Sequence, residues 1–97
     1  MKRLRLVHAA EVELAEVAVY YESHAENMGA IFLRRFDETV AILREHPRAA
    51  PVLHGSMRRK IIAKFPYALL YRDEPDEIVV VAVMHMRRKP DYWAGRE

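Results

Sequence analysis

The feature that most constrains the fold is an unbroken apolar run, Ile78-Val79-Val80-Val81-Ala82-Val83-Met84. Successive side chains of a strand point to opposite faces, so a strand with this sequence must be buried on both faces. We therefore predict a central strand from Glu77 to about Met86. A chain of 97 residues can bury one hydrophobic core, and we expect a single domain over residues 1–97.

The first half of the chain carries the period of amphipathic helices, with apolar stripes over residues 9–27 and 29–45. Asn27-Met28-Gly29 can turn the chain between them, and His46-Pro47 ends the second helix because the residue before proline disfavours helix. With so short a connection the two helices should pack antiparallel. The stripes consist of Leu14, Val17, Ala18, Tyr21 and Ala25, and of Phe32, Phe36, Val40 and Leu43.

Alternating patterns predict three further strands, at residues 3–7, 58–64 and 67–72, with a loop at residues 47–56. The predicted order is β-α-α-β-β-β. This is an α+β fold in which an antiparallel helical hairpin packs on a mostly antiparallel, four-stranded sheet. We expect residues 87–97 to form a short C-terminal tail or helix.

Composition limits the chemistry that is available. The chain has no cysteine, so disulfides and thiolate chemistry are excluded. Its five histidines show no metal-ligand spacing and its three glycines form no phosphate loop, so we expect neither a metal nor a cofactor. The basic N-terminus leads into Glu11 and Glu13, and no apolar run approaches the roughly 20 residues that span a bilayer. We therefore expect a soluble, cytoplasmic protein without membrane contact.

Charge is segregated along the sequence, although the formal net charge is only +2. Residues 9–27 contain five glutamates and neither Lys nor Arg. Residues 54–97 contain nine Lys and Arg side chains, and four of the six acids there fall in one turn at 73–77. Such a distribution favours polyanions on one face and basic partners on another.

Four segments together resemble the RelE/ParE superfamily of bacterial type II toxins, which includes plasmid stabilisation proteins. They are Tyr20-Tyr21-Glu22, Glu45-His46-Pro47, the stretch from Arg58-Arg59-Lys60 to Phe65-Pro66-Tyr67-Ala68-Leu69-Leu70-Tyr71, and the ending His85-Met86-Arg87-Arg88-Lys89-Pro90-Asp91-Tyr92-Trp93. The resemblance covers essentially the whole chain. It implies a growth-inhibiting toxin that a cognate antitoxin holds inactive. It also implies one of two targets, because RelE-like members cleave mRNA on the ribosome and ParE-like members poison DNA gyrase.

The ribonuclease hypothesis needs an acid, a base and cations around a phosphate, without a metal. We predict a catalytic set of His85, Arg87 and Tyr92, because imidazole can serve as acid or base and Arg87 shares a strand face with His85. The side chains predicted to bind nucleic acid are Arg58, Arg59, Lys60, Lys64, Arg88 and Trp93. The hypothesis requires Arg58 and Arg87 to lie together on one anion-binding surface.

Each candidate also has a purely structural interpretation. His85 can be packed or hydrogen-bonded, Arg87-Arg88-Lys89 can be a solvated strand end, and Tyr92 and Trp93 can form a lid over the core edge. One departure counts against a nuclease: RelE-like nucleases carry an arginine after the first tyrosine of Tyr-x-Leu-x-Tyr, where this chain has Ala68. Metal-independent mRNA cleavage is the first hypothesis for the target. The alternatives are a ParE-like gyrase inhibitor and a non-toxic relative that only binds the antitoxin.

The antitoxin surface is predicted from apolar side chains that lie off the main helical stripes. Exposed apolar residues beside a helical hairpin are typical of a binding groove. Acidic residues of an antitoxin tail should also meet the basic clusters at Arg58-Arg59 and Arg87-Arg88, so we expect binding to weaken with salt. The predicted antitoxin-binding residues are Val12, Val19, Tyr20, Ile31 and Leu33.

Overall fold

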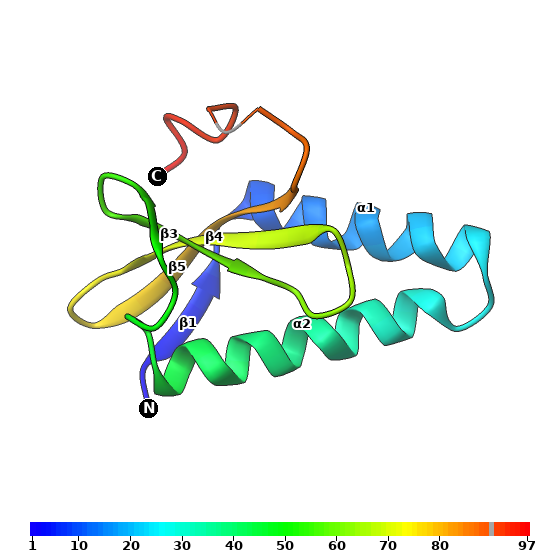
Figure 1. Cartoon of the computed structure of the whole chain (residues 1–97), viewed down its shortest axis with the longest axis horizontal. Helices are drawn as coiled ribbons and strands as arrows, with labels where there is room; N and C mark the ends of the chain where they lie inside the picture. Colours follow the sequence, from blue (N-terminus) through cyan, green and yellow to red (C-terminus); the bar gives the residue numbers. More distant parts are fainter. Residues whose placement is uncertain (90) are drawn as a thin grey trace.

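The computed structural model describes residues 1–89 and 91–97, so Pro90 of the C-terminal motif lies outside the described residues. The elements in chain order are β1 (Arg3–Leu6), α1 (His8–His24), α2 (Met28–Glu45), β2 (Val52–His54), β3 (Met57–Ile61), β4 (Tyr67–Asp73) and β5 (Glu77–His85). The strands form one sheet in the order β1-β5-β4-β3-β2 (Figure 1). No helix in the described part of the chain is long and apolar enough to cross a membrane.

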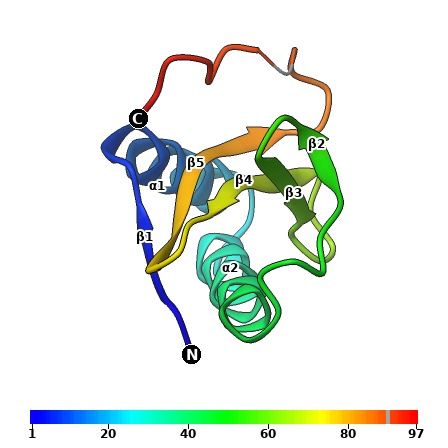
Figure 2. The ribbon, with the colours of Figure 1, turned by 90° about the vertical axis from the view of Figure 1, so that its left-hand side faces the viewer.

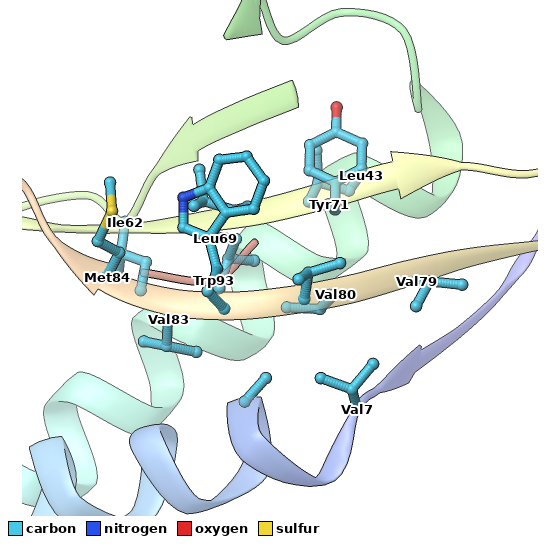
Figure 3. Packing of buried hydrophobic residues seen from close by; sticks show 14 of the residues in the cluster. Val7, Leu43, Ile62, Leu69, Tyr71, Val79, Val80, Val83, Met84 and Trp93 are labelled. Atoms are coloured by element: carbon cyan, nitrogen blue, oxygen red, sulfur yellow. The ribbon is translucent and has the colours of Figure 1, made fainter. Parts of the chain in front are cut away.

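Strand β5 lies at the centre of the fold, as its apolar sequence predicted. Every residue between its two ends is buried, and it pairs parallel with β1 and antiparallel with β4. The C-terminal segment crosses the side of the sheet away from α2 (Figure 2). Figure 3 shows Val83 on the helix side of β5 and Trp93 on the other side. Both faces of β5 are therefore covered, which is why both carry apolar residues.

The helical hairpin depends on a close approach of its two helices near the turn. A Cβ atom on Gly29 would lie 2.6 Å from the backbone oxygen of Ala18, so only glycine fits without a shift of the helices. Glu22 holds the start of α2, because its carboxylate accepts the N–H groups of Asn27 and Gly29, each at 3.0 Å. Asn27 takes the left-handed conformation (φ 69°) that this turn requires.

The predicted architecture is correct in outline but has one strand too few. The segment 47–56, predicted as a loop, contains β2, which pairs antiparallel with β3. A strand of three residues shows no sequence period, and for this reason the pattern missed it. The sheet is thus five-stranded and mixed, although four of its strands form antiparallel pairs. Ala25, predicted on the apolar stripe, is exposed because α1 ends at His24.

Candidate functional site

His85, the predicted acid or base, is the last residue of β5 and lies opposite Tyr67 of β4. Its ring meets the Tyr67 ring edge-on, with 5.0 Å between the centroids. Its Nδ1 accepts the backbone N–H of Arg87 at 3.0 Å, which leaves Nε2 to carry the proton of a neutral imidazole. His85 is thus held on two sides by its own chain.

The cavity beside His85, called the His85 pocket below, has a volume of about 160 Å³. It brings His85 together with Arg88 and Tyr92, but two carboxylates of α1 line it as well. The full lining is Glu13, Glu16, Val17, Tyr67, Val83, His85, Arg88 and Tyr92. Among the described residues, Arg88 is the one permanent cation of this lining and Glu16 lies there with it, so the pocket offers little net positive charge to a phosphate.

Tyr92 is half-buried against the His85 pocket. The guanidinium of Arg88 stacks on its ring, 3.7 Å from the centroid. Burial, together with the nearby Glu13 carboxylate, raises the pKa of Tyr92 to about 12. Its hydroxyl is buried and has no hydrogen-bond partner in residues 1–89 and 91–97. A phenol in this state is a weak acid and gives up no proton near neutral pH.

Glu13 and Arg96 form a contact that the sequence does not reveal, because 83 positions separate them. Beyond Val80, β5 no longer pairs with β1, and the ion pair occupies this open edge of the strand. Glu13 accepts the N–H of Val83 at 3.0 Å, Arg96 donates to the carbonyl of Val81 at 3.1 Å, and the two side chains meet at 2.9 Å. The charges of Glu13 and Arg96 are therefore used inside the protein.

Arg58 and Arg87 do not lie together, so the single basic surface predicted from sequence is wrong. Arg58 is the second residue of β3, at the level of Tyr71 and Val80, whereas Arg87 follows the other end of β5. The five strand positions between Val80 and His85 correspond to about 16 Å. The Arg58 guanidinium also donates to the carbonyls of Arg48 (3.2 Å) and Ala50 (2.7 Å). It thereby fixes the segment between α2 and β2.

The other predicted cations are divided over three places. Lys60 lies at the level of Leu69 and Val83, whereas Arg59, the preceding residue of β3, points to the opposite face. Lys64 lies in the turn between β3 and β4. Of the predicted set, only Arg87 and Arg88 are exposed next to His85.

Trp93, predicted to stack on a base, is 9% exposed and covers the sheet (Figure 3). Its ring lines a cavity of about 350 Å³ together with Leu53 and His54 of β2. The part-buried ion pair Glu13–Arg96, at 2.9 Å, fastens the segment around it, and the pair Arg5–Glu97, at 2.7 Å, is exposed to solvent. The position of Trp93 in this structure corresponds to the lid interpretation, with the indole packed rather than presented to solvent.

Two apolar grooves flank the helical hairpin, and they divide the predicted antitoxin residues. The hairpin groove, of about 500 Å³, is lined by Leu6, Glu11, Leu14, Ala15, Ala18, Val19 and Leu33. The tip groove, of about 480 Å³, is lined by Tyr21, His24, Ala25, Met28, Ile31, Arg35, Lys64 and Phe65. Val19 and Leu33 thus lie in the first groove and Ile31 in the second, while Val12 and Tyr20 are exposed outside both.

The sequence did not indicate the tip groove, because its floor combines the end of α1, the start of α2 and the β3–β4 turn. Only the tertiary fold brings Lys64 and Phe65 to the hairpin. In the part of the chain that the structure describes, no group of three or more His, Cys, Asp or Glu side chains could hold a metal ion.

The sequence and the fold were compared with those of known proteins. Residues 4–90 match the family described as "ParE toxin of type II toxin-antitoxin system, parDE". A solved structure titled "Chromosomal ParDE TA system from P. aeruginosa" is similar in fold, with a TM-score of 0.77 and 16% sequence identity over 88% of this chain and 96% of that chain. Among curated proteins none matches this sequence significantly. The matched region includes both helices, β2 to β5 and all of β1 except Arg3, and the chain therefore belongs to the ParE toxin family of type II toxin–antitoxin systems.

Proposed function

We propose that this toxin arrests growth by binding a protein target, DNA gyrase, and that it does not cleave RNA. The observation that carries this proposal is the lining of the His85 pocket, which brings no second Lys or Arg side chain to Arg88 in the part of the chain that the structure describes. Glu16 lines the cavity where the scissile phosphate of an RNA would have to lie, and Glu13 lines it too, with its charge offset by Arg96. Like charges at short range in a partly desolvated site disfavour that arrangement, and a nuclease of this type needs convergent cations.

Three further features support a binding mechanism over a catalytic one. Ala68, which stands where RelE-like nucleases carry an arginine, is 0% exposed and belongs to the core. Arg58 lies about 16 Å from the level of His85, measured along the strands, and its guanidinium donates to backbone carbonyls. Tyr92 holds its proton up to high pH. Ala68 and Arg58 therefore supply no contact to a phosphate at His85, and Tyr92 supplies no base for the ribonuclease hypothesis.

We assign neutralisation to the hairpin groove, which is apolar and open. An amphipathic helix of a cognate antitoxin can lay its apolar face along Leu14, Ala18 and Leu33, as helix-in-groove complexes do. The exposed side chains of Val19 (68%) and Val12 (42%) would extend that contact along α1. A toxin with this target would act in the cytoplasm, and we include that location in the proposal.

The test compares wild-type toxin with His85→Ala, each induced without antitoxin in growing cells. We expect both proteins to arrest growth equally, to induce the DNA-damage response and to leave full-length mRNA intact on primer extension. Co-expressed antitoxin should restore growth in both strains. Cleaved mRNA in the wild-type strain, absent from the His85→Ala strain, would overturn the proposal and support the ribonuclease hypothesis.

A further inference from the structure

We propose that the tip groove is the target-binding site of this toxin, and that it takes an acidic segment of the target protein with an apolar or aromatic side chain anchored in the groove. This inference rests on the proposed function, since it needs a protein target. It assigns the target to a different surface from the antitoxin. Of the predicted antitoxin-binding residues, Ile31 alone lines the tip groove.

The floor of the tip groove is aromatic and firmly packed. The Tyr21 ring meets the Phe65 ring edge-on at 4.9 Å and stacks on Phe32 at 5.6 Å, and Phe32 meets Phe65 at 5.1 Å. Tyr67 closes the cluster from β4, 6.2 Å from Tyr21. A floor of this kind is preorganised, so an incoming side chain does not have to order it, and little binding energy is lost on docking.

The rim of the tip groove is cationic. Lys64 from the β3–β4 turn and Arg35 from α2 both line it, with His24 at the end of α1. Lys64 forms no ion pair within the described residues. The partner of Arg35 is Glu38 at 3.1 Å, an exposed pair that a carboxylate of a ligand can replace at little cost.

Two acids are close in sequence to His24, Glu22 and Glu26, and neither lines the groove. Glu22 has a structural role instead. Both of its oxygens accept backbone N–H groups at the start of α2, from Asn27 and Gly29. Positive charge around an apolar floor is complementary to acidic residues flanking an apolar one, and such complementarity selects the partner and speeds its association.

The backbone at Lys64 adds an independent observation. Its φ is +73°, a left-handed conformation that is costly for a residue with a Cβ atom and that glycine adopts freely. The turn nevertheless places a lysine there, with its exposed ammonium at the edge of the tip groove. Residues held in strained conformations concentrate at binding sites, where the position of the side chain matters more than its local cost.

The two grooves differ in charge, and this difference separates their partners. The hairpin groove is lined by Glu11 and by no Lys, Arg or His, whereas the tip groove is lined by three basic side chains and no acid. No residue lines both. An acidic segment is therefore directed to the tip groove, and the hairpin groove remains for the antitoxin helix.

The first test reverses one charge at the rim. Lys64→Glu should raise the inducer concentration required for growth arrest at least tenfold, compared at equal protein level. Antitoxin binding and the unfolding midpoint should stay as in the wild type. Lys89→Glu is the matched control, because it makes the same change at an exposed lysine outside the groove and should arrest growth normally.

Normal growth arrest by Lys64→Glu would overturn the inference, and so would loss of antitoxin binding, which would assign the groove to the antitoxin. Failure of the proposed function has a different signature, since it appears as mRNA cleavage by the wild type whatever Lys64→Glu does.

The second test is direct binding by the purified toxin to a random copolymer of glutamate and tyrosine, observed by amide chemical shifts. We expect chemical-shift changes at Tyr21, Met28, Ile31, Lys64 and Phe65. The affinity should fall several-fold between about 50 and 300 mM salt, about the change expected when salt screens two to three ionic contacts. Polyglutamate without tyrosine should bind more weakly. Shifts centred on Arg87 and Arg88 instead, or none at all, would contradict the inference.

Discussion

The His85 pocket and the tip groove contain similar residue types, but they differ in how far those residues are already engaged. In the His85 pocket, Glu13 binds Arg96 and the Val83 amide, and Arg88 covers the ring of Tyr92. At the tip groove the aromatic rings form the floor and the cations stand at the rim. A cluster of functional residue types can thus be a structural network, and a binding surface is better recognised by charge and apolar area left without an internal role.

The largest expected effect concerns the hairpin that carries the tip groove. Gly29→Ala puts a Cβ atom 2.6 Å from the Ala18 carbonyl oxygen, a backbone atom that cannot move aside alone. The helices must separate, and we expect a loss of about 2–3 kcal/mol in the free energy of unfolding. Urea denaturation monitored by circular dichroism measures it. Ala30→Gly is the control on the exposed side of the same turn, with a loss of about 1 kcal/mol or less. Equal losses in the two variants would show that the close approach is unimportant.

The second prediction tests whether the Glu13–Arg96 pair is structural. Arg96→Ala leaves the part-buried Glu13 without its cation and the Val81 carbonyl without its donor. We expect a loss of about 1–2 kcal/mol in the free energy of unfolding, together with faster exchange of the Val83 amide. The exposed Arg5 serves as the comparison, and Arg5→Ala should leave the unfolding midpoint unchanged. Unchanged stability in Arg96→Ala would mean that the edge of β5 does not need the pair.

The third prediction uses the raised pKa of Tyr92. The unfolded tyrosine loses its proton near pH 10 and the folded one near pH 12, so its contribution to stability is complete below pH 10 and is lost as the pH rises from 10 to 12. Tyr92→Phe should make this alkaline loss shallower. At pH 7 the variant should be at least as stable as the wild type, because it removes a buried hydroxyl without a hydrogen-bond partner. Urea denaturation at pH 7, 9 and 11 measures both effects, and an unchanged pH profile would contradict the assignment.

The smallest effect on stability is expected at Lys64. Lys64→Gly removes the strain of the left-handed backbone but also raises the conformational entropy of the unfolded chain. We therefore expect the free energy of unfolding to rise by no more than about 1 kcal/mol. Toxicity should nevertheless fall, because the cation at the rim is lost. This pairing of retained stability with lost toxicity separates a binding role from a folding role. A strongly destabilised Lys64→Gly would show that the lysine side chain holds the turn.

The sequence predicted the elements whose side chains repeat with a clear period. Phe32, Phe36 and Leu43 follow the helical repeat and are buried, and β5 is apolar on both faces. The repeat did not extend to β2, which has three residues between Pro51 and Gly55. The repeat does not reach the tail either, so a lid over the core edge was one of two interpretations of Trp93, and only the contacts of the tail with distant parts of the chain decide between them.

The error over Arg58 and Arg87 has a geometric cause that the sequence already contained. Consecutive antiparallel strands reverse direction, so the start of β3 lies at the same edge as the end of β4 and the start of β5. Arg58 therefore had to lie away from the end of β5, where Arg87 follows His85. By contrast, neither the Glu13–Arg96 contact nor the tip groove could be read from the sequence, because each joins residues through tertiary packing alone.

The central claim, a toxin that binds its target and does not cut RNA, is tested most directly by supercoiling of relaxed plasmid with purified gyrase and purified toxin. We expect wild type and His85→Ala to inhibit supercoiling with the same half-maximal concentration, and Lys64→Glu to need at least ten times more protein. Supercoiling that proceeds unchanged with the wild-type toxin, or inhibition that is lost in His85→Ala, would contradict it.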